Sequence, residues 1–131
     1  MKHDYILIVD DDPGIHQLLG LILRPLSFNV KSATSGQDAL GMIGTDPPRL
    51  IILDLSMPGI SGFDVLSHLA EFPATSTIPV VIFSGNIETT ELSGHEWPAQ
   101  VTQVLAKSSI HPAEFREIIT EQMAAGNASA G

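Results

Sequence analysis

The chain has 131 residues, of which 44% are hydrophobic and 16% are charged, and it contains no cysteine. These values predict a single globular domain with a real core, and they exclude a disordered chain, a disulfide scaffold and a cysteine zinc site. Six Lys and Arg residues stand against 15 Asp and Glu residues, so the formal net charge is −9, which argues against nucleic-acid binding through a basic surface. The acidity fits a protein that binds a divalent cation or a basic partner, or it serves solubility alone.

Five short apolar runs predict strands. Three of them are nearly continuous hydrophobic segments rich in Ile and Val, a pattern typical of strands buried on both faces of a parallel sheet. In chain order the predicted strands are Tyr5 to Val9, Asn29 to Ala33, Leu50 to Leu53, Pro79 to Phe83 and Val101 to Ala106.

Segments with helical spacing separate these strands. Asp12 is a favourable N-cap before a proline, and apolar residues then recur with a helical period until Pro25, which should end or bend the first helix. Ser35 should cap a second helix that reaches Ile43. The apolar residues that mark two further helices are Phe63, Leu66 and Leu69 for one and Phe115, Ile118, Ile119 and Met123 for the other.

The connection from Asn86 to Pro98 has a different pattern. A helix is expected between the fourth and fifth strands, but the apolar residues there have poor helical spacing, Thr89 and Thr90 are β-branched, and Gly94 interrupts the segment. We therefore predict a short or irregular helix in this connection.

The alternation of strands and helices predicts right-handed βαβ units, and hence an α/β fold with a doubly wound, five-stranded parallel sheet. We expect one domain over residues 1–123 and a flexible C-terminal tail over residues 124–131, whose residues are small and polar. No apolar stretch approaches the roughly 20 residues that span a bilayer, and the first residues have no signal-peptide pattern. The prediction is a cytoplasmic protein without membrane contact.

Polar residues stand where the predicted strands end. Asp10 and Asp11 follow the first strand, Asp54 the third, Ser84 the fourth and Lys107 the fifth. Each one has an ordinary explanation as a helix cap, a turn residue or a surface charge. In an open parallel sheet, however, the carboxyl ends of the strands meet at the edge where ligands bind. We therefore predict that these residues form one site.

Three carboxylates brought close together repel one another, and a hard cation with oxygen ligands resolves the conflict. Mg²⁺ (or Mn²⁺) fits, because Mg²⁺ binds one or two carboxylates and leaves a position for a phosphate oxygen. An ionised Asp54 could then attack phosphorus and form an acyl phosphate. Lys107 and the Ser84 hydroxyl could neutralise the oxygens of the transferred group.

Four segments resemble the receiver domains of two-component response regulators, in the same order and over nearly the whole chain. They are VDDDP at Val9 to Pro13, LDLSMPGISG at Leu53 to Gly62, FSG at Phe83 to Gly85 and AK at Ala106 and Lys107. The resemblance implies a flavodoxin-like fold with strand order 2-1-3-4-5.

By position, the resemblance makes Asp54 the phosphoacceptor. Asp10 and Asp11 match the acidic pair that holds the metal, with Asp11 a direct ligand, and the backbone carbonyl of Ser56 matches the third protein ligand beside Asp54. It also makes Ser84 the switch hydroxyl and Lys107 the lysine of the family's pattern.

The resemblance further implies a signalling domain rather than an enzyme, with self-catalysed phosphotransfer and autodephosphorylation as its only chemistry. The chain lacks a P-loop for ATP, so the donor would be a phosphohistidine on a sensor histidine kinase or a histidine phosphotransfer protein. The downstream partner would be another protein rather than nucleic acid.

The sequence departs from the family pattern at three places. Ser108 stands where a proline usually follows the lysine, so we expect a trans bond before it, because a cis bond before a non-proline residue costs about 3 kcal/mol. Val104 stands where members often carry a Tyr or Phe that rotates on activation, and the connection from Asn86 to Pro98 lacks a clear helix. These departures keep open a pseudo-receiver, which has the fold but acts through protein contacts without phosphorylation.

The remaining candidates carry weaker signals. The five histidines have no metal-ligand spacing, and no function is predicted for them. Trp97 either anchors its loop onto the sheet or is exposed to a partner. Gly59 and Gly62 are expected to supply turn geometry.

Overall fold

The computed structural model describes residues 4–85 and 96–130, with side chains through residue 125. Its five-stranded sheet is parallel throughout, in the order β2-β1-β3-β4-β5. The strands are β1 (Tyr5–Val9), β2 (Asn29–Ala33), β3 (Leu50–Leu53), β4 (Val80–Ser84) and β5 (Val101–Ala106). The doubly wound sheet predicted from the sequence is therefore confirmed, with β4 one residue later than expected.

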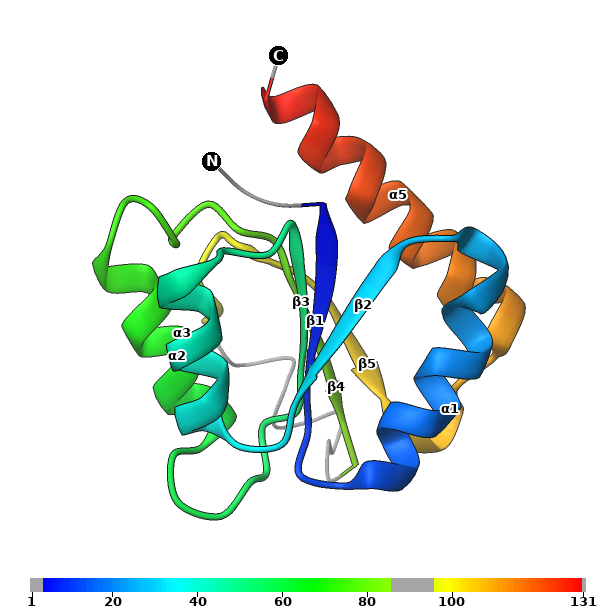
Figure 1. The fold of residues 1–131 in the computed structure, drawn as a ribbon, viewed down its shortest axis with the longest axis horizontal. Coiled ribbons are helices and arrows are strands. Elements are labelled where there is room, and N and C mark those ends of the chain that lie inside the picture. The colour runs from blue at the N-terminus through cyan, green and yellow to red at the C-terminus, as the bar shows by residue number, and fades with distance from the viewer. Residues whose placement is uncertain (1–3, 86–95, 131) are drawn as a thin grey trace.

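Helices cover both faces of this sheet (Figure 1), with α1 and α5 on one side and α2 and α3 on the other. They are α1 (Pro13–Leu23), α2 (Gly36–Thr45), α3 (Gly62–Glu71) and α5 (Pro112–Ala130), with 3₁₀ turns η1 (Arg24–Leu26) and η2 (Lys107–Ser109). The irregular helix predicted between Asn86 and Pro98 falls mainly on residues 86–95, which lie outside the described residues.

The helices begin where the sequence places their caps. The Asp12 carboxylate accepts a hydrogen bond from the Gly14 N–H at 2.8 Å, and Ser35 Oγ accepts one from the Asp38 N–H at 3.0 Å. Such side chains satisfy N–H groups that have no partner within the helix. At the other end of α1, the chain passes into the 3₁₀ turn η1, which contains Pro25, as expected because proline lacks an N–H donor.

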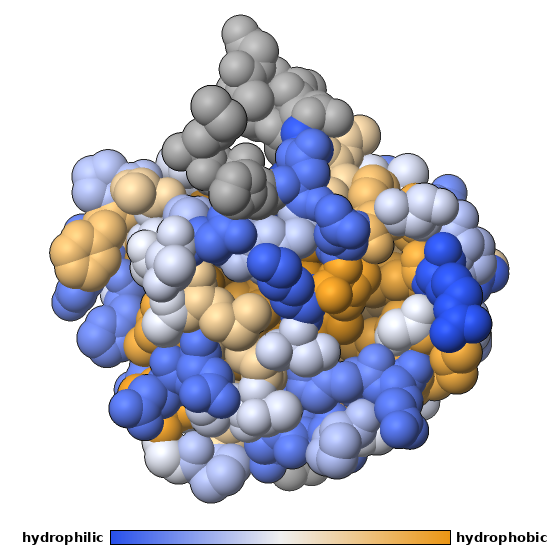
Figure 2. All heavy atoms as spheres, viewed as in Figure 1, coloured by the Kyte–Doolittle hydropathy of each residue, from blue (hydrophilic) through white to orange (hydrophobic). Residues whose placement is uncertain are grey.

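Burial follows the strand pattern. Every residue of β1, β3 and β4 is buried, whereas β2 lies at one edge of the sheet and is largely exposed. Two hydrophobic clusters lie on the two faces of the sheet. Hydrophilic residues cover much of the face seen in Figure 2, and hydrophobic residues show in recesses near its centre and in patches at its left and right margins.

The last helix is longer than predicted. It continues to Ala130, so residues 124–130, which the sequence analysis assigns to a flexible tail, are helical. The reason is that this segment is rich in alanine, the strongest helix former, and continues a helix already held in the core by Phe115, Ile119 and Met123. A domain boundary at residue 123 stays a prediction. No helix in the described part of the chain is long and apolar enough to cross a membrane.

Candidate functional site

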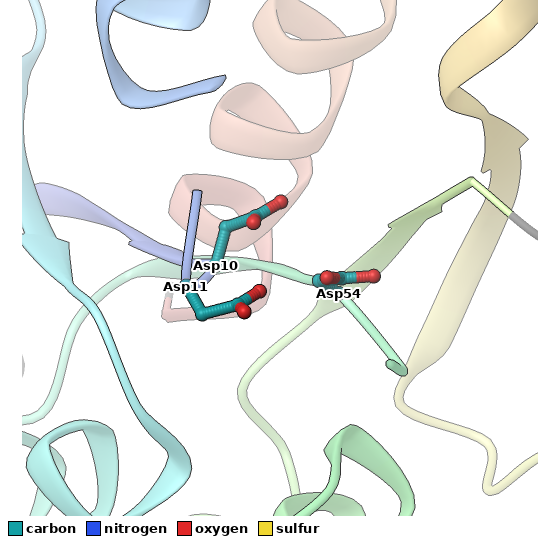
Figure 3. Close-up of side chains that lie close together, drawn as sticks. All are labelled: Asp10, Asp11 and Asp54. Atoms are coloured by element: carbon teal, nitrogen blue, oxygen red, sulfur yellow. The ribbon is translucent and has the colours of Figure 1, made fainter. Parts of the chain in front are cut away.

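Three carboxylates meet at the carboxyl edge of the sheet (Figure 3). Asp10 and Asp11 follow β1 and Asp54 follows β3, the strand beside it. One carboxylate oxygen of each residue lies within 4.8 Å of the others. Asp10 and Asp54 are 1% and 3% exposed, whereas Asp11 is exposed. The structure thus brings together the three acids that the sequence analysis selected.

The ammonium group of Lys107 lies against this cluster. Its Nζ is 2.7 Å from Asp10 Oδ2 and 3.4 Å from Asp54 Oδ2. Burial by itself lowers the pKa of Lys107, but the hydrogen bond to Asp10 and the attraction of both carboxylates outweigh burial and raise this pKa. Burial raises the pKa of Asp10, and the hydrogen bonds from Lys107 and from the Asp12 N–H only partly oppose that shift.

The second oxygen of Asp54 receives two donors. The Ser84 hydroxyl donates to Asp54 Oδ1 at 2.7 Å from the buried end of β4, and the Ser56 N–H donates to the same oxygen at 3.3 Å. Asp54 therefore has a cation at one oxygen and a hydroxyl at the other. The Ser56 side chain is exposed, so Ser56 meets the site through its main chain; the role of its carbonyl stays a prediction.

Comparison with known proteins identifies the family of this chain. The family model described as response regulator receiver domain matches residues 6–120. The chain belongs to this receiver-domain family. Over 87 residues it is 34% identical to the DNA-binding response regulator MtrA of Mycolicibacterium smegmatis, matching 66% of this chain and 37% of MtrA. Over 79 residues it is 40% identical to the response regulator PleD of Caulobacter vibrioides, matching 60% of this chain and 17% of PleD. The chain thus spans less than two thirds of the length of these curated relatives.

Solved structures agree with this membership. The response regulator TrrA of Thermotoga maritima, solved in complex with Mg²⁺ and BeF, is 26% identical with a TM-score of 0.76, and the match covers 93% of this chain and 99% of TrrA. A sensor protein from Polaromonas is 26% identical with a TM-score of 0.82, over 95% and 98% of the two chains. The likeness therefore extends over the whole domain.

The loop after Asp54 brings α3 close to the phosphoacceptor candidate of this receiver domain. Gly59 has φ +75°, which confirms its predicted turn geometry. Gly62 serves a different purpose from the predicted one, because it is the first residue of α3 and is needed for close approach. A Cβ atom on Gly62 would lie 2.2 Å from the Asp54 carbonyl oxygen and 2.6 Å from Leu55 Cα. Glycine thus allows the start of α3 to pack directly on the Asp54 main chain.

One residue near the site was not predicted. His16 on α1 places Nε2 2.7 Å from the backbone carbonyl oxygen of Asp10. A search for metal-ligand spacing misses such a contact, because the partner is a main-chain carbonyl six residues earlier. The contact requires α1 to place His16 beside the end of β1.

The departures from the family pattern have clear places in the structure. The bond between Lys107 and Ser108 is trans, as expected. Val104 is half-buried and packs against the core under α2 and α3. Trp97 packs against the same core, and its ring stacks on Phe63 of α3 with centroids 6.0 Å apart and planes 7° apart. This packing agrees with the anchoring interpretation of Trp97, although the ring contact lies on α3 rather than on the sheet; a contact of the half-buried ring with a partner stays a prediction.

The donor set fits a small divalent ion. Its side-chain ligand atoms are all carboxylate oxygens, which Mg²⁺ prefers. One oxygen of each acid lies within 4.8 Å of the others, so one small ion could contact all three. Three ionised carboxylates and one ammonium also leave a local charge of two negative units. A divalent cation would neutralise this excess.

Proposed function

We propose that this receiver domain accepts a phosphoryl group on Asp54, in a reaction that depends on Mg²⁺. The observation that carries the proposal is the buried Asp54 carboxylate, which has the Ser84 hydroxyl at one oxygen and Lys107 at the other. Lys107 neutralises negative charge and the Ser84 hydroxyl stabilises it by donating a hydrogen bond, and both would lie next to an incoming phosphoryl group. Receiver domains are signalling modules, so we propose signalling rather than turnover of a substrate.

The chemistry is a displacement at phosphorus. A carboxylate oxygen of Asp54 would attack the phosphorus of a phosphohistidine, the P–N bond would break, and the imidazole would leave and take up a proton. The product would be an aspartyl phosphate. In such reactions catalysis consists mainly of positioning and neutralising the oxygens of the transferred group, which Lys107 and Ser84 can do without a general base.

Asp10, Asp11, Asp54 and the Ser56 carbonyl would hold Mg²⁺, which supplies positive charge to the phosphoryl oxygens. The oxygen-only donor set and the local negative charge support this assignment. TrrA, to which this chain is similar, was solved with Mg²⁺ and BeF. Lys107 keeps Asp10 and Asp54 partly neutralised before the ion binds.

The surface of α1 supports a protein as the donor. This helix begins two residues after Asp11 and contains no Lys, Arg, Asp or Glu, and Leu18 and Leu21 are exposed on it. An uncharged apolar face beside the site suits a helix of a histidine kinase or a histidine phosphotransfer protein. Leu21→Glu should slow transfer from phosphorylated histidine phosphotransfer domains but leave phosphorylation by acetyl phosphate unchanged. Phe72→Glu, an exposed residue at the far end of α3, is the matched control and should affect neither reaction.

The experiment that tests the proposal is phosphorylation by a small donor. The protein is incubated with acetyl phosphate and Mg²⁺, and intact mass should increase by about 80 Da, the mass of one phosphoryl group. The adduct should be stable in acid and labile in base. It should not form when EDTA replaces Mg²⁺, and it should not form in Asp54→Asn. Asp12→Asn is a matched control in the same acidic run, because asparagine still caps α1, and it should keep the adduct.

The second candidate is a pseudo-receiver that acts by protein contact alone. The observation that favours it is Val104, which leaves the position of the usual aromatic switch without a ring. It predicts no adduct with acetyl phosphate or with a protein donor, a result that would also overturn phosphorylation at Asp54.

A further inference from the structure

His16 contacts the acidic turn from α1. Its Nε2 lies 2.7 Å from the Asp10 carbonyl oxygen. A carbonyl oxygen can only accept a hydrogen bond, so Nε2 must carry the proton and donate it. In the neutral ring, Nδ1 is then unprotonated, and Nδ1 is buried without a hydrogen-bond partner among the described residues. The contact to Asp10 therefore selects one tautomer of His16.

Asp10 is held by contacts from several elements. Its N–H donates to the Ala33 carbonyl of β2 at 3.1 Å, and its carboxylate receives the Asp12 N–H at 2.9 Å and Lys107 at 2.7 Å. His16 holds the remaining polar group, the carbonyl that leads into the peptide bond with Asp11. The orientation of that peptide plane determines the position of the Asp11 Cα.

Asp11 is the acid that depends most on this main chain. Its side chain is exposed, whereas those of Asp10 and Asp54 are buried and held by donors. An exposed carboxylate can adopt several rotamers and has no side-chain contact that fixes it. The region that the Asp11 carboxylate can reach is therefore set by the position of the Asp11 Cα. A donor that fixes the preceding carbonyl restricts that position.

We propose that His16 is a positioning residue of the receiver site. By donating from Nε2 to the Asp10 carbonyl, it fixes the turn between Asp10 and Asp11 and keeps Asp11 within reach of a cation shared with Asp10 and Asp54. The effect on the cation rests on the proposed function, but the contact and the tautomer do not. The same arrangement occurs at metal sites where groups behind the ligands hold them in place, and removing such a group typically weakens binding about 10- to 100-fold.

Divalent-ion affinity measures this role. Free Mn²⁺ is followed by electron paramagnetic resonance during titration of the full chain. His16→Leu, which has no donor, should weaken Mn²⁺ binding about tenfold, and His16→Gln, which keeps an N–H donor, should recover most of the affinity. Gln17→Leu, at the next position of α1, is the matched control and should bind as the wild type does. Urea unfolding in EDTA accompanies each variant, since a purely structural role would lower stability in metal-free buffer and leave the affinity of the folded protein unchanged.

The tautomer provides a test that needs no binding. At pH 8, where an ordinary imidazole is neutral, long-range ¹H–¹⁵N spectra of the wild-type chain should show His16 protonated at Nε2, with its signals assigned by their loss in His16→Gln. Protonation at Nδ1, or fast averaging between the two tautomers, would overturn the proposal even if His16→Leu failed to fold. Equal Mn²⁺ affinity of His16→Leu and wild type would also overturn it and leave the proposed function intact. If the wild type bound no Mn²⁺, the proposed metal site would fail, together with the effect of His16 on it, and the spectra would still decide the contact.

Discussion

Replacing Lys107 with methionine tests the electrostatics of the site through folding stability. Methionine keeps much of the length of the side chain but removes the charge, so the buried carboxylates of Asp10 and Asp54 lose their cation. At an effective dielectric constant of about 20, unit charges 2.7 Å and 3.4 Å apart attract by roughly 6 and roughly 5 kcal/mol. Loss of ammonium hydration on folding offsets most of this attraction.

The net cost follows from the burial of the partners. Removing one member of a buried ion pair typically costs about 3–5 kcal/mol. The Lys107 side chain is 21% exposed, so we expect Lys107→Met to lower the free energy of unfolding by about 3 kcal/mol. Because the folded-state pKa of Lys107 is raised, its stabilising contribution is complete below the unfolded-state pKa and is lost only as pH rises through the folded-state value. Lys107 therefore contributes fully at pH 7, and Lys107→Met should show its whole destabilisation at that pH.

Urea unfolding in EDTA, followed by circular dichroism, measures this loss. With a slope of about 2 kcal/mol per molar urea, the midpoint should fall by about 1.5 M. Lys31→Met is the matched control: Lys31 is 51% exposed and lies 3.5 Å from Asp46, so its loss should cost less than about 1 kcal/mol. Saturating Mg²⁺ should reduce the deficit of Lys107→Met, because a bound cation replaces the lost charge. The reasoning is refuted if the two variants lose equal stability in EDTA.

Three further perturbations address other parts of the site. Ser84→Ala, which removes the hydroxyl 2.7 Å from Asp54 Oδ1, should slow phosphorylation by acetyl phosphate about 100- to 1,000-fold. Ser56→Ala should leave the rate unchanged, because the Ser56 contact with Asp54 comes from its main-chain N–H. Equal rates for both variants would contradict the role of Ser84. Gly62→Ala should lower the melting temperature by several degrees, because its Cβ would overlap the Asp54 carbonyl. Gly41→Ala is the control: a Cβ there has nothing within 4 Å, so the change should be neutral or stabilising by up to about 1 kcal/mol. Similar melting temperatures for the two variants would show that α3 does not pack tightly on the Asp54 main chain. Burial raises the pKa of Asp10, so its ionisation opposes folding. Its contribution to folding stability is therefore largest below its unfolded-state pKa and declines as pH rises through its folded-state pKa. In metal-free buffer the wild type should gain stability relative to Asp10→Asn as pH falls from 7 to 4, and a constant or opposite difference would refute this sign.

The sequence predicts the strands well because β1, β3 and β4 are buried on both faces, and burial of that kind leaves uninterrupted apolar runs. The start of β4 differs by one residue because Pro79 cannot donate to the ladder, and the strand reaches Ser84 instead. The acids, Ser84 and Lys107 are predictable because each stands at the end of a strand or within two residues after it, and parallel strands end at one edge.

Features that depend on packing between elements are less visible in the sequence. The length of α5 differs because small residues suggest flexibility by composition, whereas their alanine content favours helix. The close approach at Gly62 and the contact of His16 with the Asp10 carbonyl depend on how α3 and α1 lie against the sheet. Neither leaves a periodic pattern or a ligand spacing.

The most direct test of the account is the position of the phosphoryl group itself. After treatment with acetyl phosphate and Mg²⁺, borohydride reduction converts an aspartyl phosphate to homoserine, which peptide mass spectrometry can locate. Phosphorylation of Asp54 predicts homoserine at residue 54 alone. Homoserine at residue 10 or 11, or an unmodified Asp54 in protein that carries a phosphoryl group, would contradict it.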